Sequence, residues 1–284
     1  MVKGTVDKEN LMSQDRTLAP LESTVFVPLE GRIFATNLFP DVLTDKKVMS
    51  LQGSVPTHLI RKNRHNEYTL LACAVRAAKL DLETQTFLKR HPDGVIVELG
   101  AGLDTGFWRA EDAGLNARAT WVEVDSAKVL AIRREWLGDE ARDISIAGDA
   151  RHDHWIRALR KRFPTSPVLV LAGGLSYFFT PDEMRELCGM LKDYGVKTLV
   201  FDAVNRVGHQ FIGHYMKKVG HGDVPVTFCL DSTAEKTRCA IGAAKIIETP
   251  FYRGVCRRGM KWTTKLTMAL SDALGCVKMV RIDF

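Results

Sequence analysis

The sequence predicts an α/β fold of the Rossmann-like type, in which helices cover both faces of a mostly parallel sheet. A glycine-rich turn follows the first predicted strand, and an aspartate closes the second. The 284 residues, of which 45% are hydrophobic and 26% charged, fit one large α/β domain with a cap. Apolar runs of strand length alternate with helical segments, and the runs lie at 95–99, 119–124, 143–147, 167–172 and 197–203.

The turn after the first strand predicts a nucleotide-binding unit. Gly100 and Gly102 stand at the carboxyl end of the apolar run 95–99, where an open α/β sheet binds its ligands. Asp125 closes the second strand, at the distance where an acid usually accepts hydrogen bonds from a ribose diol. An ordinary strand-to-helix turn remains the alternative interpretation, because short glycine motifs also occur by chance.

The glycine spacing separates two classes of nucleotide. A dinucleotide fingerprint needs a third glycine, but Gly102 is followed here by Leu-Asp-Thr. Glu98 precedes the turn, and a carboxylate there would repel a pyrophosphate and suit a cationic ligand. S-adenosylmethionine has a ribose, a sulfonium and no phosphate. The pattern therefore favours this cofactor, with a nicotinamide oxidoreductase as the disfavoured alternative.

The segments on either side of the predicted sheet are expected to cover it. Residues 1–20 are predicted to be mobile, and 21–90 to be helical, since apolar residues recur there at spacings of three and four. Together, 1–90 form a predicted helical lid on a core of 91–284. Beyond Asn205 we expect a substrate-pocket insertion at about 205–263, with a helix at 206–218 and a strand at 226–230. A helix at 265–274 and a strand at 277–284 follow.

Charge and composition narrow the classes of partner. The formal net charge is +6 and the pI near 9.0, but the basic residues are scattered and lack the interleaved aromatics of a single-strand binder. This distribution disfavours a nucleic-acid partner and favours a small acceptor, anionic or phenolic, drawn in by positive potential. Oligomeric state stays open, although small enzymes of this kind often form homodimers.

The cysteines and histidines indicate neither disulfides nor a metal. The six cysteines include no Cys-x-x-Cys pair, and His152-Asp153-His154 lacks a third ligand nearby. His209 and His214, five residues apart, would project from poorly matched helix faces. The polar amino terminus does not resemble a signal peptide, and the longest apolar stretch, 168–179, is too short to span a bilayer. We expect a soluble, cytoplasmic protein.

Several strings resemble the leucine carboxyl methyltransferase family, and within it the bacterial branch of tetracenomycin-type O-methyltransferases. They are ELGAGLDTGFWR (98–109), WVEVDSAKVLAIRREWL (121–137), PVLVLAGGLSYFFTPDEM (167–184), TVFVPLEGRIFATNLFPDVLTDKKVM (24–49) and KTLVFDAVN (197–205). The resemblance implies a class I methyltransferase fold with a seven-stranded sheet that includes an antiparallel strand. It also implies S-adenosylmethionine-dependent methylation of a carboxyl or hydroxyl oxygen of a small molecule, in specialised, polyketide-type metabolism.

The resemblance carries cofactor-binding roles onto matching positions. Arg76 would grip the cofactor carboxylate, although by pattern alone it reads as a surface arginine on an amphipathic helix. Asp149 and Ala150 would face the adenine, and Asp149 also suits a helix N-cap. The predicted cofactor-binding residues are Arg76, Glu98, Gly100, Gly102, Asp104, Asp125, Asp149, Ala150 and Gly173.

Three positions depart from the family pattern. Gly106 replaces an arginine, Gly173 a glutamate and Phe178 a tyrosine. Because each change removes a polar group, we expect an altered or enlarged acceptor pocket. A carboxylate acceptor needs no general base, whereas a phenol, with a pKa of about 10, would use one. The sequence shows no convincing base, and only Tyr177 and His152 stand as catalytic candidates.

Two alternatives to a small-molecule O-methyltransferase remain. The departures at Gly173 and Phe178 fit a degenerate member that binds S-adenosylmethionine without catalysis and acts as a partner or regulator. Protein carboxyl termini and modified tRNA are acceptors elsewhere in the family, so a methyltransferase acting on either is the second alternative.

Overall fold

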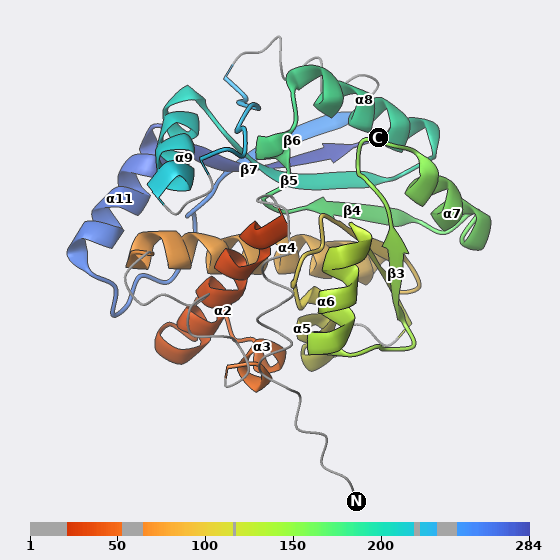
Figure 1. Ribbon diagram of the computed structural model, residues 1–284, viewed down its shortest axis with the longest axis horizontal. Coiled ribbons are helices and arrows are strands. Elements are labelled where there is room, and N and C mark those ends of the chain that lie inside the picture. The colour runs from red at the N-terminus through yellow and green to blue at the C-terminus, as the bar shows by residue number, and fades with distance from the viewer. Residues whose placement is uncertain (1–21, 53–64, 116–117, 219–221, 232–242) are drawn as a thin grey trace, which may run out of the picture.

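The computed structural model describes residues 22–52, 65–115, 118–218, 222–231 and 243–284. The predicted amino-terminal segment 1–20 lies outside these residues. Within them, seven strands form one sheet in the order β3-β2-β1-β4-β5-β7-β6 (Figure 1). The strands are β1 (Val95–Leu99), β2 (Thr120–Asp125), β3 (Asp143–Ala147), β4 (Val168–Ala172), β5 (Thr198–Val204), β6 (Lys245–Pro250) and β7 (Val277–Asp283).

The pairing of the strands confirms the predicted mostly parallel sheet. Strands β1 to β5 pair in parallel, whereas β7 pairs antiparallel with both β5 and β6. The strand order reverses at β1. Strands β2 and β3 lie on one side of β1, and β4 and β5 lie on the other side. In open α/β sheets such a switch point places a crevice at the carboxyl ends of the strands.

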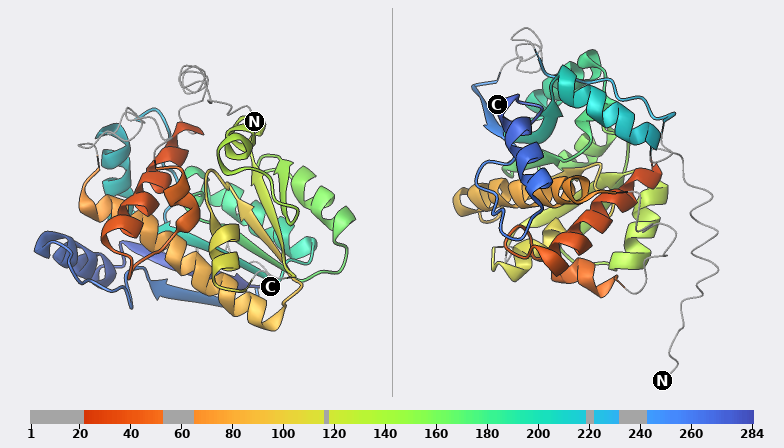
Figure 2. Two further views of the ribbon diagram at one scale, coloured as in Figure 1. Left: turned by 90° about the horizontal axis from the view of Figure 1, so that it is seen from below. Right: turned by 90° about the vertical axis from the view of Figure 1, so that its left-hand side faces the viewer.

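Helices connect the strands and pack on both faces of the sheet (Figures 1 and 2). They are η1 (Glu22–Val25), α2 (Phe26–Leu38), α3 (Lys46–Ser50), α4 (Glu67–Arg90), α5 (Gly106–Asp112), α6 (Ala127–Leu137), α7 (His154–Arg162), η2 (Ser176–Phe178), α8 (Pro181–Asp193), α9 (Arg206–Lys218) and α11 (Trp262–Ala273).

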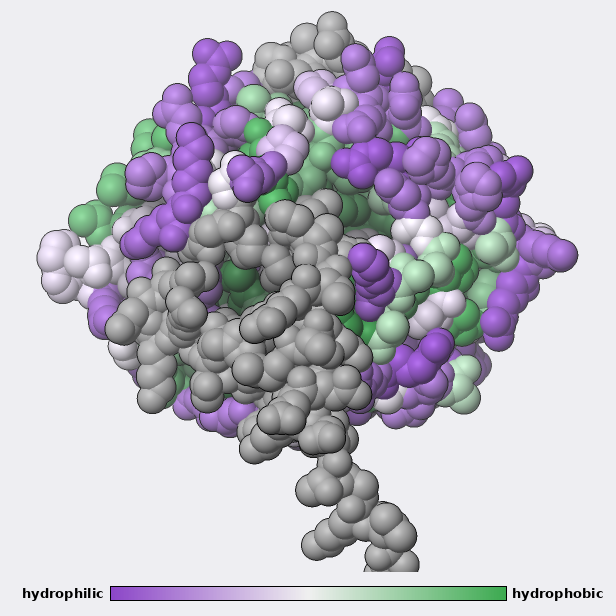
Figure 3. All heavy atoms as spheres, in the orientation of Figure 1, coloured by the Kyte–Doolittle hydropathy of each residue, from purple (hydrophilic) through white to green (hydrophobic). Residues whose placement is uncertain are grey.

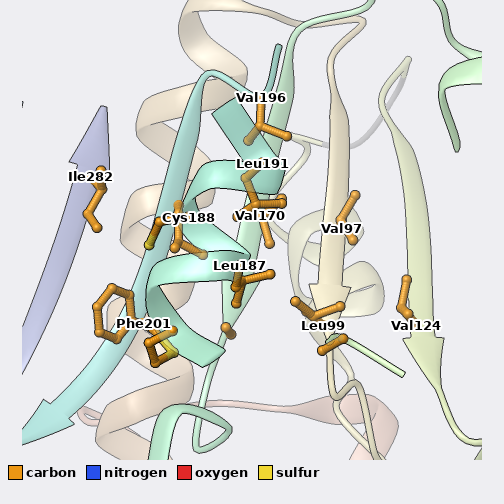
Figure 4. Close-up of a cluster of buried hydrophobic side chains, with 14 of the residues drawn as sticks. Val97, Leu99, Val124, Val170, Leu187, Cys188, Leu191, Val196, Phe201 and Ile282 are labelled. Carbon is orange, nitrogen blue, oxygen red and sulfur yellow. The ribbon is translucent and has the colours of Figure 1, made fainter. Parts of the chain in front are cut away.

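Alternation along the strands explains why both faces are covered. Val95, Val97 and Leu99 of β1 face one way and belong to a core cluster with α7 and α8. Figure 4 shows side chains of this cluster gathered between the strands and α8. Ile96 points the opposite way, into a cluster with α4, α5 and α11. A strand that is buried on both faces reads as the continuous apolar run seen in the sequence.

Local signals in the sequence begin the helices that border the site. Thr180 and Glu183 form a reciprocal capping box at the start of α8, with Pro181 at the first helical position. Ser126 caps α6 through its hydroxyl, which accepts from the Val129 amide. That helix therefore starts immediately after Asp125.

The predicted helical region 21–90 divides into two parts. Helix α4 packs on the sheet through Leu71, Ala74 and Val75, so it is one of the layers that cover the sheet. Helices α2 and α3 lie outside it and share a third cluster with Leu103 and with Ile132 of α6. Among the described elements of this region, η1, α2 and α3 have the position of a lid, and the division into lid and core remains a prediction.

The region after α9 differs from the sequence prediction in one respect. Residues 226–230 do not form a strand; Thr227 donates its amide to the Tyr177 carbonyl and Leu230 to that of Val204, and Phe228 and Leu230 are buried. The strand that this region does contain is β6. The sequence prediction missed it because its six residues end in a proline. It lies at the sheet edge, where proline is tolerated.

Candidate functional site

A cavity of about 1130 Å³ lies at the carboxyl ends of the central parallel strands. Its walls come from α2, α4, the turns after β1, β3 and β4, the end of β2, and helices α9 and α11. Figure 3 shows hydrophobic side chains in a recess near the middle of this face, with hydrophilic side chains above it. Ligand pockets usually measure roughly 300–1,000 Å³, so the cavity has room for more than one small ligand.

The glycine turn and Asp125 are joined directly. Gly100 and Gly102 have φ angles of 71° and 52°, which L-residues with side chains rarely adopt. The Gly102 amide donates to Asp125 Oδ2 at 2.8 Å, and the Ser126 amide donates to Oδ1 at 2.7 Å. Asp125 lines the cavity, so its carboxylate borders the space for a ligand.

Glu98 lines the same cavity, but its environment does not favour the negatively charged carboxylate that the sequence suggests. Its side chain is buried, and Oε2 has no hydrogen-bond partner among the described residues. Burial, reinforced by Asp104, raises the pKa of Glu98 to about 8. Burial thus favours the protonated form of Glu98, which weakens the argument that its carboxylate would attract a cationic ligand.

Arg76 is not a surface arginine, because it forms an ion pair with the fully buried Asp202 at the cavity wall. Its Nε donates to Asp202 Oδ2 at 2.7 Å, and its side chain is 18% exposed, while that of Asp202 is 0% exposed. Asp202, on β5, also accepts from the Gly174 amide at 2.6 Å and from the Tyr177 hydroxyl. Asp202 thereby fixes the arginine beside the turn after β4.

Tyr177 lines the cavity, but its hydroxyl is committed to Asp202. Burial and the neighbouring carboxylate both raise the pKa of Tyr177 well above its usual value. A phenol that is held protonated in this way serves as a hydrogen-bond donor to Asp202. His152, the other catalytic candidate, is exposed and is not among the cavity-lining residues.

The turn after β4 is lined by α4. A Cβ atom on Gly173 would meet Leu80 Cδ1 at 2.7 Å and Arg76 Cδ at 3.2 Å. The space next to Gly173 is thus already taken by these two side chains. Phe178, at the second departure from the family pattern, lines the cavity and is partly buried.

Asp104 belongs to a buried cluster of charges behind the glycine turn. It accepts from Arg32 Nη1 and from Arg109 Nη2, each at 3.0 Å. Arg109 also binds Asp81 through two bonds and Asp45 through Nη1. Burial alone would raise the pKa of Asp104, but the two arginines hold it well below its usual range. The cluster joins α2, α4 and α5 to the turn, which pattern reading did not detect.

Asp149 and Ala150 line the cavity after β3. Asp149 accepts from the Arg151 amide at 2.9 Å and is exposed. It does not cap α7, whose N-cap residue is Asp153. Of the nine predicted cofactor-binding residues, all line the one cavity: Arg76, Glu98, Gly100, Gly102, Asp104, Asp125, Asp149, Ala150 and Gly173.

Gly106 offers a direct test of the packing behind the turn. A Cβ atom there would meet Glu98 Oε1 at 2.3 Å and Trp121 at 3.2 Å. We expect Gly106→Ala to lower the free energy of unfolding by about 1–3 kcal/mol through overpacking. The control is Gly189→Ala in α8, where a Cβ meets no atom within 4 Å and should stabilise by about 0.5–1 kcal/mol. Equal urea midpoints for Gly106→Ala and wild type would contradict the expectation.

The described residues contain no group of three or more His, Cys, Asp or Glu side chains arranged to hold a metal ion. No disulfide joins the five cysteines that the structure describes, and Cys239 lies outside those residues. No described helix is both long and apolar enough to cross a membrane.

Comparisons with known proteins find similar sequences and similar folds. Residues 32–192 match the family model of leucine carboxyl methyltransferase. The tetracenomycin polyketide synthesis O-methyltransferase TcmP of Streptomyces glaucescens is 28% identical over 130 residues, which are 45% of this chain and 46% of that protein. The chain thus matches about half the length of that curated relative.

Solved structures share the fold. A protein of Thermobifida fusca assigned as a methyltransferase superposes with a TM-score of 0.54 at 14% identity, covering 89% of this chain and 93% of its own. A DUF574-family protein from Streptomyces avermitilis gives 0.55 at 11% identity, with 89% and 96% covered. At these identities the likeness concerns the fold alone.

Proposed function

The chain belongs to the leucine carboxyl methyltransferase family, and from this premise we propose that it is an S-adenosylmethionine-dependent O-methyltransferase acting on a small molecule. The observation that carries the proposal is the shared cavity. Asp125, the glycine turn and the partly buried Arg76 all line it, and they come from β2, the β1 turn and α4. The cavity also leaves space for an acceptor.

The residues present fit the cofactor. Asp125 is a carboxylate held at the end of a strand by two backbone amides, which suits a ribose diol. Arg76 presents a guanidinium at the cavity wall, which suits a carboxylate. Gly100 and Gly102 let the backbone approach a ligand closely. When bound, the cofactor would supply a methyl group on a positively charged sulfur.

The protein's own contribution is to align the acceptor and exclude water. Methyl transfer is an in-line displacement, so much of the rate enhancement comes from holding the reacting atoms in line. The cavity lies between α2, α4 and α9, which can enclose an acceptor beside the glycine turn. We propose an aromatic, polyketide-type acceptor with a carboxyl or hydroxyl oxygen, a class suggested by the printed name of the Streptomyces relative.

The first test is calorimetric titration with S-adenosylmethionine and S-adenosylhomocysteine. Asp125→Ala should weaken the binding of both compounds by about 10–100-fold, because a charge-assisted hydrogen bond contributes about 1.5–3 kcal/mol and each 1.4 kcal/mol is tenfold. Asp139→Ala, which removes only a surface partner of Arg134, should bind like wild type. Melting temperatures of both variants would show whether the fold is kept.

The titration also separates the proposal from its alternative. Wild type that binds neither compound would refute the cofactor assignment. Binding without methylation of any small carboxylate or phenol would instead favour a member that binds the cofactor and works as a partner or regulator.

A further inference from the structure

A carboxyl, an imidazole and a phenol are arranged in series at one wall of the cavity. They belong to Glu30 of α2, His65 just before α4, and Tyr215 of α9. Tyr215 Oη lies 2.5 Å from His65 Nδ1, and His65 Nε2 lies 3.5 Å from Glu30 Oε2. The His65 and Glu30 side chains are 5% and 11% exposed, whereas Tyr215 lines the cavity.

Close packing of two helices brings the three groups together. A Cβ atom on Gly31 would meet the Leu70 carbonyl oxygen at 2.6 Å and Cys73 Cβ at 2.7 Å, so α2 lies against the first turns of α4. This contact sets Glu30 next to the segment that enters α4, where His65 lies. The His65 and Tyr215 rings then meet with centroids 5.8 Å apart.

The direction of the Tyr215–His65 hydrogen bond depends on the His65 tautomer. The 3.5 Å from Nε2 to Glu30 Oε2 is an ion-pair distance, and Oε2 has no hydrogen-bond partner among the described residues. We assign the imidazole hydrogen to Nε2, which faces Glu30, so that Nδ1 accepts from the Tyr215 hydroxyl. The phenol oxygen keeps its lone pairs for a group in the cavity, as in other sites where an imidazole is oriented by an acid and activates a hydroxyl.

We propose that Tyr215, His65 and Glu30 form a proton relay that deprotonates a hydroxyl acceptor, which makes phenols the preferred substrate class of this cavity. The inference rests on the proposed methyl transfer and adds the base that the sequence did not reveal.

The step balances as a displacement coupled to proton transfer. The acceptor hydroxyl gives its proton to Tyr215 Oη as the Tyr215 hydrogen passes to His65 Nδ1. The acceptor oxygen forms a bond to the methyl carbon, the carbon–sulfur bond breaks, and the sulfur keeps the electron pair. The positive charge lost from sulfur reappears on His65, where Glu30 balances it.

The electrostatic surroundings suit a relay. Burial, together with Cys73 and Glu30, raises the pKa of Tyr215 above its usual value, so the phenol stays protonated and passes a proton on. Burial raises the pKa of Glu30 to about 7. Because the relay needs Glu30 ionised, phenol methylation should increase as the pH rises through about 7. Cys73, next to these groups, also interacts electrostatically with Arg32, Arg76 and Asp202, and His214 of α9 lines the cavity as well.

The test compares matched acceptors in the wild type and in Tyr215→Phe. With labelled S-adenosylmethionine, 1-naphthol and other phenols should be methylated about 100-fold more slowly by the variant, the range of a lost general base. Transfer to 1-naphthoate and other carboxylates, which are already ionised, should change by less than about threefold. Tyr194→Phe, which removes a hydroxyl bonded to Asp153 elsewhere, is the control.

If Tyr215→Phe slowed the methylation of phenols and carboxylates equally, Tyr215 would have a purely structural role and the inference would be overturned. The inference would also be overturned if the wild type methylated carboxylates but no phenol. In that case the proposed methyltransferase function would stand. Glu30→Gln should remove the rise in rate through about pH 7; a retained rise would also count against the relay.

A second readout needs no turnover. With S-adenosylhomocysteine present, the absorbance of bound 4-nitrophenol reports its ionisation. The relay predicts that the bound phenol ionises at a lower pH on wild type than on Tyr215→Phe. Equal ionisation on the two proteins, at equal affinity for S-adenosylhomocysteine, would contradict it.

Discussion

Replacing Arg109 with alanine is expected to lower the free energy of unfolding by about 3–5 kcal/mol, since it removes one cation from the fully buried Asp45 and from the partly exposed Asp81 and Asp104. Asp45 is 0% exposed and accepts from Arg109 Nη1 at 3.1 Å. Arg109 also forms two bonds to Asp81, at 2.8 and 2.9 Å. Urea unfolding followed by tryptophan fluorescence measures the loss.

The control for Arg109→Ala is an exposed ion pair. Arg134 and Asp139 are 61% and 68% exposed, so Arg134→Ala should change stability by no more than about 0.5 kcal/mol. Similar losses in the two variants would show that the buried cluster contributes no more than a surface pair. Because Asp104 and Arg32 join this cluster to Leu103, loosening it should also disturb the glycine turn.

The second large effect is expected at Arg76, and it concerns one end of the cofactor. Arg76→Lys should lower the affinity for S-adenosylhomocysteine by about 10–100-fold. The planar guanidinium can bind a ligand carboxylate and Asp202 at the same time, and lysine has no such group. Methylthioadenosine has the same nucleoside but no amino-acid group. Its affinity should change by less than about threefold in the variant.

The comparison of these two ligands separates recognition from packing. If Arg76→Lys weakened both ligands equally, the arginine would act only through Asp202 and the shape of the cavity wall. The exposed Arg185, paired with Asp182 on α8, provides the control substitution Arg185→Lys, which should leave both affinities unchanged.

Several parts of the site could be predicted because their signals are local. Positive φ angles at Gly100 and Gly102 require glycine, and an acid at the end of the neighbouring strand follows from the βαβ unit. Asp202 had a weaker signal, since it is a charge within an otherwise apolar strand, and it was overlooked.

Other properties of these residues depend on burial, which sequence pattern does not give. Arg76 reads as a surface residue on its helix, yet it is paired inside the protein with Asp202. Glu98 reads as a carboxylate, yet burial raises its pKa to about 8 and favours its protonated form. In both cases the identity of the side chain was evident, but its state follows from what packs around it.

By itself, the sequence determined the strands β1 to β5, the glycine turn and the acid Asp125, because hydrophobic periodicity and glycine conformation act over a few residues. The tertiary structure alone decided the edge strand β6 and the pairing of Arg76 with Asp202, 126 positions apart. It also decided the series of Glu30, His65 and Tyr215. Such contacts depend on how the helices cross and on which polar groups are removed from water when the protein folds. The spacing of residues along a short segment contains neither kind of information.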